Sequence, residues 1–169
     1  MTPRRRARTV GSMTETATRP LVRRPGEGQL VSAPAGQLTY KARGEETGGV
    51  VTVLETVVAP GEGPALHVHV DDDEFIYVLG GRLRVRLEDA VHEAPAGSFI
   101  FVPKGVAHTW RNAGDSEARL LVGFTPAAPG MERFFQRSSE LTDETRLSDA
   151  FKHFATDAGM TVLGPPLAD

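Results

Sequence analysis

The chain has 169 residues, a formal net charge of −3 and no cysteine. A chain of this length forms one domain with tails, and without cysteine it has neither disulfides nor thiolate metal ligands. No apolar stretch approaches the length of a membrane-spanning helix, and no apolar segment of the kind found in secretory signals follows the N-terminal arginines. We therefore expect a cytoplasmic protein that does not bind membranes.

Residues 1–35 are rich in Arg, Pro, Gly and Thr and show no sustained periodicity. Seven arginines against one glutamate in residues 1–24 make this segment basic. Basic clusters can contact nucleic acid or anionic membranes, but a short cluster of low hydrophobicity is more typical of a solvated tail. We interpret residues 1–35 as a flexible basic arm and expect no nucleic-acid partner. Met13 is a second candidate start, which would make residues 1–12 an upstream extension.

Residues 36–126 contain a series of short strand-like segments separated by Gly and Pro. These segments are 38–42, 50–58, 66–70, 74–79, 82–87, 98–102, 107–112 and 119–124. The pair Gly80-Gly81 predicts a hairpin between two of them, because both residues tolerate positive φ. In the second arm of that hairpin, arginines alternate with apolar residues, so one face is solvated and the other buried. Short strands without intervening helices predict an antiparallel sandwich or barrel.

From Pro129 onward the apolar residues adopt helical spacing. A first group is Met131, Phe134 and Phe135, and a second group follows Thr142, which we expect to be a helix N-cap. The second stripe consists of Leu147, Ala150, Phe151, Phe154 and Ala155. We expect residues 127–169 to form helices and a tail that pack on the barrel. Their aromatic side chains could instead cover a substrate, but core packing is the favoured interpretation.

Four side chains able to bind a metal lie in two short blocks, with His67, His69 and Glu74 in the first and His108 in the second. Because side chains alternate along a strand, His67 and His69 point the same way. Two imidazoles and a carboxylate in one space suit a divalent transition metal, and a third imidazole from a distant strand would complete the set. Fe, Mn, Ni, Co, Cu and Zn all fit such donors. The alternative is a pair of tolerated histidines beside a structural glutamate.

At these residues the chain resembles the cupins, specifically the single-domain bacterial type similar to quercetin dioxygenase. The first cupin motif is Gly, five residues, His-x-His, three or four residues, Glu, six residues and Gly, and it is matched by Gly61, His67, His69, Glu74 and Gly81. The second is Gly, five residues, Pro-x-Gly, two residues, His, three residues and Asn, matched by Gly97, Pro103, Gly105, His108 and Asn112. The resemblance implies an all-β fold. We expect an antiparallel double-sheet jelly-roll barrel over residues 36–126, with a metal in its mouth and a short C-terminal helical segment.

The residues around the candidate ligands indicate an apolar chamber. By strand alternation, Ile76 and Val78 share the face of Glu74, and Trp110 shares the face of His108. We expect these three residues to contact substrate, although Trp110 is equally compatible with ordinary barrel core. Such a lining suits a small aromatic or weakly polar molecule better than a phosphosugar, which would need basic side chains inside.

The resemblance leaves three functions open. The favoured one is a metal-dependent dioxygenase in which Glu74 also acts as a base toward the substrate. The alternatives are a non-redox isomerase, cyclase or decarboxylase that uses the metal as a Lewis acid, and a binding protein without catalysis. Cupins of this kind commonly form homodimers, so we expect a homodimer to which the N-terminal arm contributes.

Several neighbouring polar residues receive plainer interpretations. The run Asp71–Asp73 resembles a solvated turn, and His92 and His153, which lie outside the motifs, are interpreted as surface residues. Asn112 is expected to hydrogen-bond the backbone.

Overall fold

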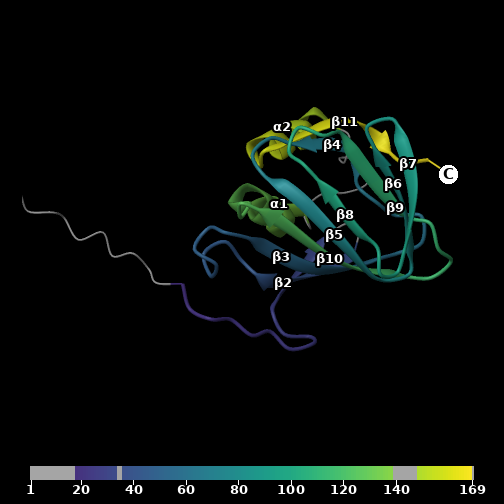
Figure 1. Cartoon of the computed structure of the whole chain (residues 1–169). Coiled ribbons are helices and arrows are strands. Elements are labelled where there is room, and N and C mark those ends of the chain that lie inside the picture. Colours follow the sequence, from purple (N-terminus) through teal and green to yellow (C-terminus); the bar gives the residue numbers. More distant parts are fainter. Residues whose placement is uncertain (1–17, 34–35, 139–147, 169) are drawn as a thin grey trace, which may run out of the picture.

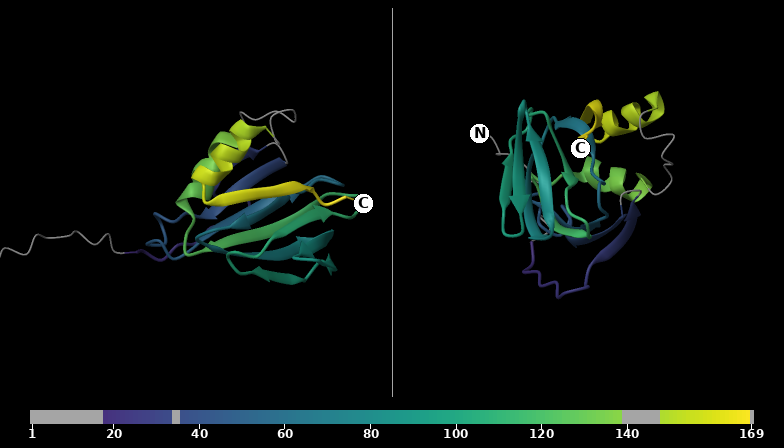
Figure 2. Two further views of the ribbon diagram at one scale, coloured as in Figure 1. Left: turned by 90° about the horizontal axis from the view of Figure 1, so that it is seen from above. Right: turned by 90° about the vertical axis from the view of Figure 1, so that its right-hand side faces the viewer.

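The computed structural model describes residues 18–33, 36–138 and 148–168. Within them, the strands form two antiparallel sheets that face each other (Figures 1 and 2). The N-terminal arginines 4–8 and Met13 lie outside the described residues, as do Thr142 and Leu147. No helix in the described part of the chain is long and apolar enough to cross a membrane.

The first sheet has six strands in the order β1-β2-β3-β10-β5-β8. Their bounds are Gln29–Ala33 (β1), Gly36–Ala42 (β2), Thr52–Val58 (β3), Ala118–Thr125 (β10), Asp73–Gly80 (β5) and Phe99–Val102 (β8). The second sheet has five strands in the order β11-β4-β9-β6-β7. Their bounds are Met160–Pro166 (β11), Ala65–His69 (β4), His108–Asn112 (β9), Arg82–Leu87 (β6) and Ala90–Pro95 (β7). The predicted all-β jelly-roll architecture is confirmed.

Strand alternation places the core between the two sheets. In β3, every second residue from Thr52 to Val58 is buried, as expected for a strand with one face on a core. The facing strand β6 contributes Leu83 and Val85, which are buried, while Arg82 is exposed. Arg84 and Arg86 are partly exposed and lie within ion-pair distance of Glu93 and Asp89. The predicted wet and dry faces of this strand are therefore present.

The predicted hairpin at Gly80-Gly81 is wrong. Strand β5 pairs with β10 and β8, whereas β6 pairs with β9 and β7, so the two arms belong to different sheets. Gly81 has φ 82°, and a Cβ atom there would lie 2.9 Å from Ala118. The turn therefore carries the chain from one sheet to the other. Alternation marks the buried face of a strand, but it does not identify the strand's neighbour.

The sheets extend beyond the predicted limits of residues 36–126. Strand β1 lies inside the segment interpreted as an arm, where it pairs with β2 and buries Val31. At the other end, β11 pairs with the histidine strand β4. Because β11 is an edge strand, it tolerates Pro165 and Pro166, which in the sequence suggest a coil.

Two helices, α1 (Pro129–Ser138) and α2 (Asp149–Asp157), lie side by side against one side of the sheets (Figure 2). Helix α2 is capped by Ser148, whose side chain accepts a hydrogen bond from the Phe151 backbone N–H. The expected cap, Thr142, lies outside the described residues. The ring of Phe134 lies 5.0 Å from that of Phe154 and 5.8 Å from that of Phe151. The helices thus pack on one another through aromatic side chains, in agreement with the core-packing interpretation.

Candidate metal centre

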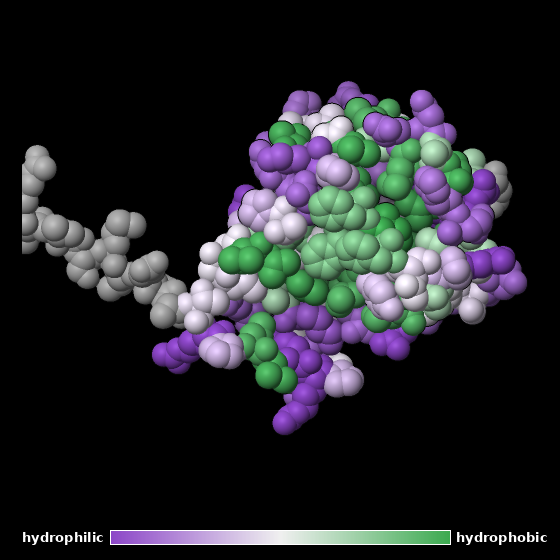
Figure 3. All heavy atoms as spheres, viewed as in Figure 1, coloured by the Kyte–Doolittle hydropathy of each residue, from purple (hydrophilic) through white to green (hydrophobic). Residues whose placement is uncertain are grey.

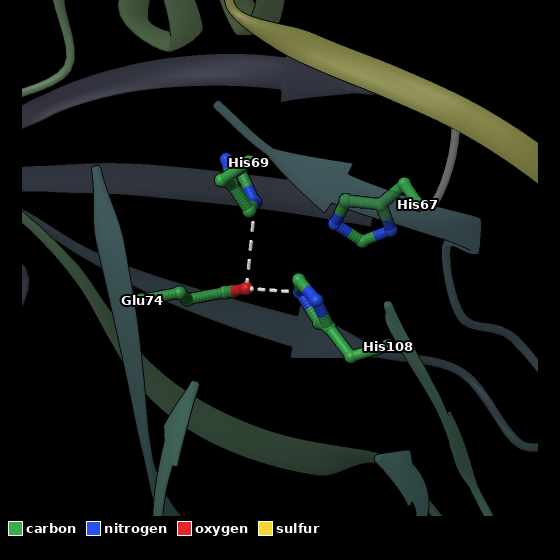
Figure 4. A group of neighbouring side chains, drawn as sticks. All are labelled: His67, His69, Glu74 and His108. Atoms are coloured by element: carbon green, nitrogen blue, oxygen red, sulfur yellow. Dashed lines mark hydrogen bonds and ion pairs between the residues drawn. The ribbon is translucent and has the colours of Figure 1, made fainter. Parts of the chain in front are cut away.

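The four predicted ligands meet in one cluster between the sheets (Figure 4). His67 and His69 project from β4 and His108 projects from the neighbouring strand β9, where it is in register with His67. Glu74 comes from β5 in the opposite sheet. All four side chains are buried, with exposed fractions between 1% and 5%.

The donor atoms of the four side chains lie within 4.8 Å of one another. Oε2 of Glu74 is 2.7 Å from Nε2 of His108 and 3.5 Å from Nε2 of His69. The rings of His67 and His108 have centroids 4.2 Å apart. Ligand atoms at about 2.1 Å from a single ion are separated by roughly 3 to 4 Å, so the spacing suits one ion.

The Nδ1 atom of each histidine has a partner outside the cluster. Nδ1 of His67 lies 2.7 Å from the carbonyl oxygen of Ala65, and Nδ1 of His108 lies 3.0 Å from that of Val106. A carbonyl oxygen only accepts, so in both rings Nδ1–H donates and Nε2 faces the centre. In His69 the partner is a carboxylate, with Oδ2 of Asp72 3.2 Å from Nδ1. Such outer contacts fix the orientation of metal-binding imidazoles.

Electrostatics in the metal-free site favour a protonated His69 beside an ionised Glu74. Burial, with the neighbouring His108, lowers the pKa of His67 to about 3. Burial also opposes a charge on His69, but the carboxylates of Asp72 and Glu74 outweigh it and raise the pKa of His69 to about 9. Burial would raise the pKa of Glu74, yet its contacts with His108 and His69 hold it well below the usual range.

These features fit a transition metal. Three imidazole nitrogens and one carboxylate oxygen are buried together, and their donor type suits divalent first-row ions. The identity of the ion is not set by this donor set. Four protein ligands around an ion that accepts six leave positions for other molecules.

Backbone turns hold the two motifs together. The motif residues Gly61, Gly81, Gly97 and Gly105 all have φ between 78° and 90°, a region that glycine adopts without strain. The N–H of Gly105 donates to the carbonyl oxygen of His69 at 2.8 Å, which joins the second motif to the first. The side chain of Asn112 donates to the carbonyl oxygens of Val58 and Ser116 and accepts from the N–H of Gly114. Its predicted backbone role is confirmed.

The structure separates the three acids of Asp71–Asp73, which the sequence suggested to be one solvated turn. Asp71 is exposed, but Asp72 has an exposed fraction of only 5% and contacts His69. Asp73 accepts a hydrogen bond from the N–H of Lys104 at 2.8 Å. The sequence contained one indication of this contact, because Asp72 follows the candidate ligand His69 by three residues. His92 and His153 are exposed, as expected.

The predicted substrate contacts Ile76, Val78 and Trp110 are buried with exposed fractions of 0%, 0% and 9%. Their role in substrate binding stays a prediction. A pocket of about 290 Å³ lies outside the cluster, between the Asp71–Asp72 turn, the start of α1 and the end of α2, and none of these three residues lines it.

Residues 54–124 match the family described as the cupin domain. The chain is 42% identical to Protein SchB of Streptomyces halstedii over 89 residues. This aligned segment covers 53% of this chain and 64% of that protein. It is 37% identical over 73 residues to Polyketide synthase CurC of Streptomyces cyaneus, covering 43% of this chain and 47% of that protein. With Quercetin 2,3-dioxygenase of Bacillus subtilis it shares 30% identity over 106 residues, or 63% of this chain and 31% of that enzyme. The chain thus spans less than two thirds of each of these relatives.

Among solved structures, an RmlC-like cupin from Shewanella frigidimarina has a similar fold, with a TM-score of 0.52 and 18% identity over 60% of this chain and 86% of that chain. The fold agrees with that of the solved cupin, and the buried His/Glu cluster is a candidate metal centre. Residues 54–124 are therefore a cupin domain. The predicted recognition and fold class are confirmed.

Proposed function

We propose that the protein is a metal-dependent enzyme that acts on a small aromatic or largely apolar substrate, with dioxygenation as the favoured reaction. The observation that carries this proposal is the convergence of His67, His69, Glu74 and His108 from both sheets into one buried cluster. The partial likeness to a quercetin 2,3-dioxygenase supports oxygen chemistry. A bound metal with open positions would supply Lewis acidity and, if redox-active, electron exchange with dioxygen.

The surroundings of the cluster support an aromatic substrate. The ring of Phe124 lies 5.3 Å from that of His69, and the ring of Phe135 on α1 lies 6.4 Å from Phe124. Ile76, Val78 and Trp110 are also buried between the sheets, and we predict that they line the same chamber. Apolar walls around a few polar groups favour a ring system with one or two polar substituents. Such walls also exclude water from the reacting atoms.

Glu74 is the residue that we assign to proton transfer. It is ionised in the metal-free site because contacts with His108 and His69 lower its pKa. The 2.7 Å contact with Nε2 of His108 orients its Oε2 atom within the cluster. A carboxylate at this place can accept the proton of a phenol or of an enolised ketone and hold it for later return.

A second function is favoured by the relative named as a polyketide synthase protein. Polyketide chains carry alternating carbonyl groups, which enolise readily and can chelate a metal. With such a substrate, proton transfer by Glu74 would serve cyclisation or isomerisation without any oxidant. A protein that only binds its ligand is the third possibility, and the same assay distinguishes it from the other two.

The test uses protein loaded separately with Fe²⁺, Mn²⁺, Ni²⁺, Co²⁺, Cu²⁺ or Zn²⁺ and mixed with a polyphenol or an aromatic 1,3-diketone. Dioxygenation would consume dioxygen and place both atoms of labelled dioxygen in the product. Cyclisation would give an unlabelled product, isomeric with the substrate or lighter by water, with no oxygen uptake. Substrate that quenches Trp110 fluorescence but is recovered unchanged with every metal would contradict an enzymatic role.

Replacing Glu74 with Gln separates proton transfer from metal binding, because the amide keeps an oxygen donor but loses basicity. We expect the loaded E74Q protein to lose about 100-fold or more in turnover while retaining metal. The matched control is H92Q, at an exposed position of β7, which should leave turnover unchanged. Full activity in E74Q with metal bound would contradict the assignment.

We further propose that the protein works as a homodimer joined at the outer face of β5 and β8. Four apolar side chains on this face, Tyr77, Leu79, Phe99 and Phe101, have exposed fractions between 39% and 62%. Hydrophobic residues gather over the middle of the face seen in Figure 3. β8 is also the last strand of its sheet among the described residues, and an edge strand has a row of backbone groups outside the ladder. A second copy would cover both the apolar side chains and this edge.

Light scattering after size exclusion tests the dimer. Wild-type protein should have twice the mass of the 18.2 kDa chain, and F99D should be monomeric. The control V91D places the same charge on an exposed position of the other sheet and should remain dimeric. At a protein concentration of about 50 μM, even a dimer with a dissociation constant in the micromolar range would be populated. A monomeric wild type at this concentration would overturn the proposal. The cytoplasmic location also stays a prediction.

A further inference from the structure

Asp72 is a buried acid outside the proposed ligand set. It lies in the turn between β4 and β5 and has an exposed fraction of 5%. Its Oδ2 atom lies within ion-pair distance of Nδ1 of His69, at 3.2 Å, and neither atom has a hydrogen-bond partner among the described residues. Burying a carboxylate is costly unless a polar partner compensates, and His69 is the compensating group here.

The three histidines differ in how their Nδ1 atoms are held. His67 and His108 each use a carbonyl oxygen two residues earlier in their own chain segment, Ala65 and Val106. These contacts belong to the backbone, so side-chain substitution leaves them in place. His69 alone of the three depends on another side chain. The side chain that faces Nδ1 of His69 is that of Asp72.

The turn that carries Asp72 is braced on both sides. The backbone N–H of Val70 donates to the carbonyl oxygen of Gly159 at 2.9 Å, just beyond α2. On the other side, Asp73 accepts a hydrogen bond from the N–H of Lys104. These contacts fix the backbone on either side of Asp72, so its carboxylate is held against His69 rather than free to turn toward solvent.

We propose that Asp72 is a positioning residue of the metal centre, which orients the His69 ring, keeps hydrogen on Nδ1 and thereby presents Nε2 to the ion. The inference rests on the metal site of the proposed function but not on any particular reaction. A carboxylate beside Nδ1 also strengthens the electron donation of the imidazole to the ion. Loss of such a partner typically weakens metal affinity 10- to 100-fold.

The test measures Zn²⁺ affinity by competition with a chromogenic chelator, in the absence of any organic substrate. D72A should bind about 10- to 100-fold more weakly than wild type. D72N should lie between them, since its amide oxygen can still accept from Nδ1. The matched control D71N removes the same charge from the adjacent exposed side chain and should retain wild-type affinity.

A nuclear magnetic resonance measurement of the imidazole nitrogens in the Zn²⁺-loaded proteins separates positioning from a general loss of structure. In D72A the ring signals of His69 should shift while those of His67 and His108 stay in place. Equal affinity in D72A and D71N, or unshifted His69 signals, would overturn the inference and leave the metal site intact. A folded wild type without Zn²⁺ affinity would overturn the inference and the proposed function together. If D72A does not fold, the comparison of D72N with D71N decides.

Discussion

Each histidine of the metal centre must meet two requirements. The ring nitrogen that faces the metal must carry no proton, and the ring must be held in one orientation. Two rings meet the second requirement through backbone carbonyls and the third through Asp72. The ligands themselves were predictable, because alternation and motif spacing define them from the sequence. The burial of one acid within Asp71–Asp73 was not, since it depends on how α2 and β11 pack against this turn.

The protonation of His69 predicts a pH dependence of metal binding. Its pKa of about 9 means that the metal-free site carries a proton there at neutral pH, and this proton must leave when the ring binds a metal. We expect Zn²⁺ binding to release protons near pH 7.5 and to release fewer above about pH 10, with affinity that rises with pH across this window. Titration calorimetry in buffers of different ionisation enthalpy measures the release. No release at neutral pH would contradict the prediction.

Gly63 shows how closely the two motifs approach each other. A Cβ atom there would lie 1.9 Å from the carbonyl oxygen of Trp110 and 2.9 Å from Cα of Arg111. We expect G63A to lower the free energy of unfolding by about 2 to 3 kcal/mol, because the backbone must shift. The control G80A meets nothing within 4 Å and should cost less than about 1 kcal/mol. Urea denaturation gives both values, and equal effects would refute the steric explanation.

The strands and helices of this fold are easier to predict from the sequence than the pairing between strands. The period of two along β3 and β5 is visible in the sequence, and so is the helical spacing around Phe134. The Gly80-Gly81 pair, however, connects strands of different sheets. The local sequence does not show which sheet each strand joins. Strands β1 and β11 were missed because both are edge strands, where Gly, Pro and polar residues are tolerated. Their pairing depends on residues far away in the sequence.

Helix α1 is attached to the first sheet through one buried carboxylate. Glu132 has an exposed fraction of 5% and accepts hydrogen bonds from the N–H of Gly44, Oγ1 of Thr52 and Nε of Arg43, at 2.8, 2.7 and 3.1 Å. Removing it leaves these donors unsatisfied.

We expect E132A to lower the free energy of unfolding by about 3 kcal/mol or more. Its control is E45A, which removes an exposed acid that also pairs with Arg43, at 2.8 Å, and which should change stability by less than about 1 kcal/mol. Chemical denaturation followed by Trp110 fluorescence provides the measurement. A loss in E132A no larger than that in E45A would mean that α1 is held mainly by its apolar contacts.

The candidate metal ligands come from both sheets of the molecule. A bound metal should therefore raise the free energy of unfolding of the whole domain. Saturation at about 100 times the dissociation constant adds about 2.7 kcal/mol. We expect Zn²⁺ to raise the thermal midpoint of wild type and the chelator EDTA to reverse the rise. The variant H108A should show almost none of this response, whereas H92A, altered at an exposed position of β7, should respond as wild type does. An identical Zn²⁺ response in H108A would place the ion elsewhere.

Three of the ligands stand on β4 and β9, while Glu74 stands across the core on β5. In a chain without cysteine, an ion held at that point takes the place that a covalent cross-link between the layers would occupy. Amide protons of β5 and β9 should then exchange with deuterium more slowly in the loaded protein, while those of the outlying strand β1 keep their rate.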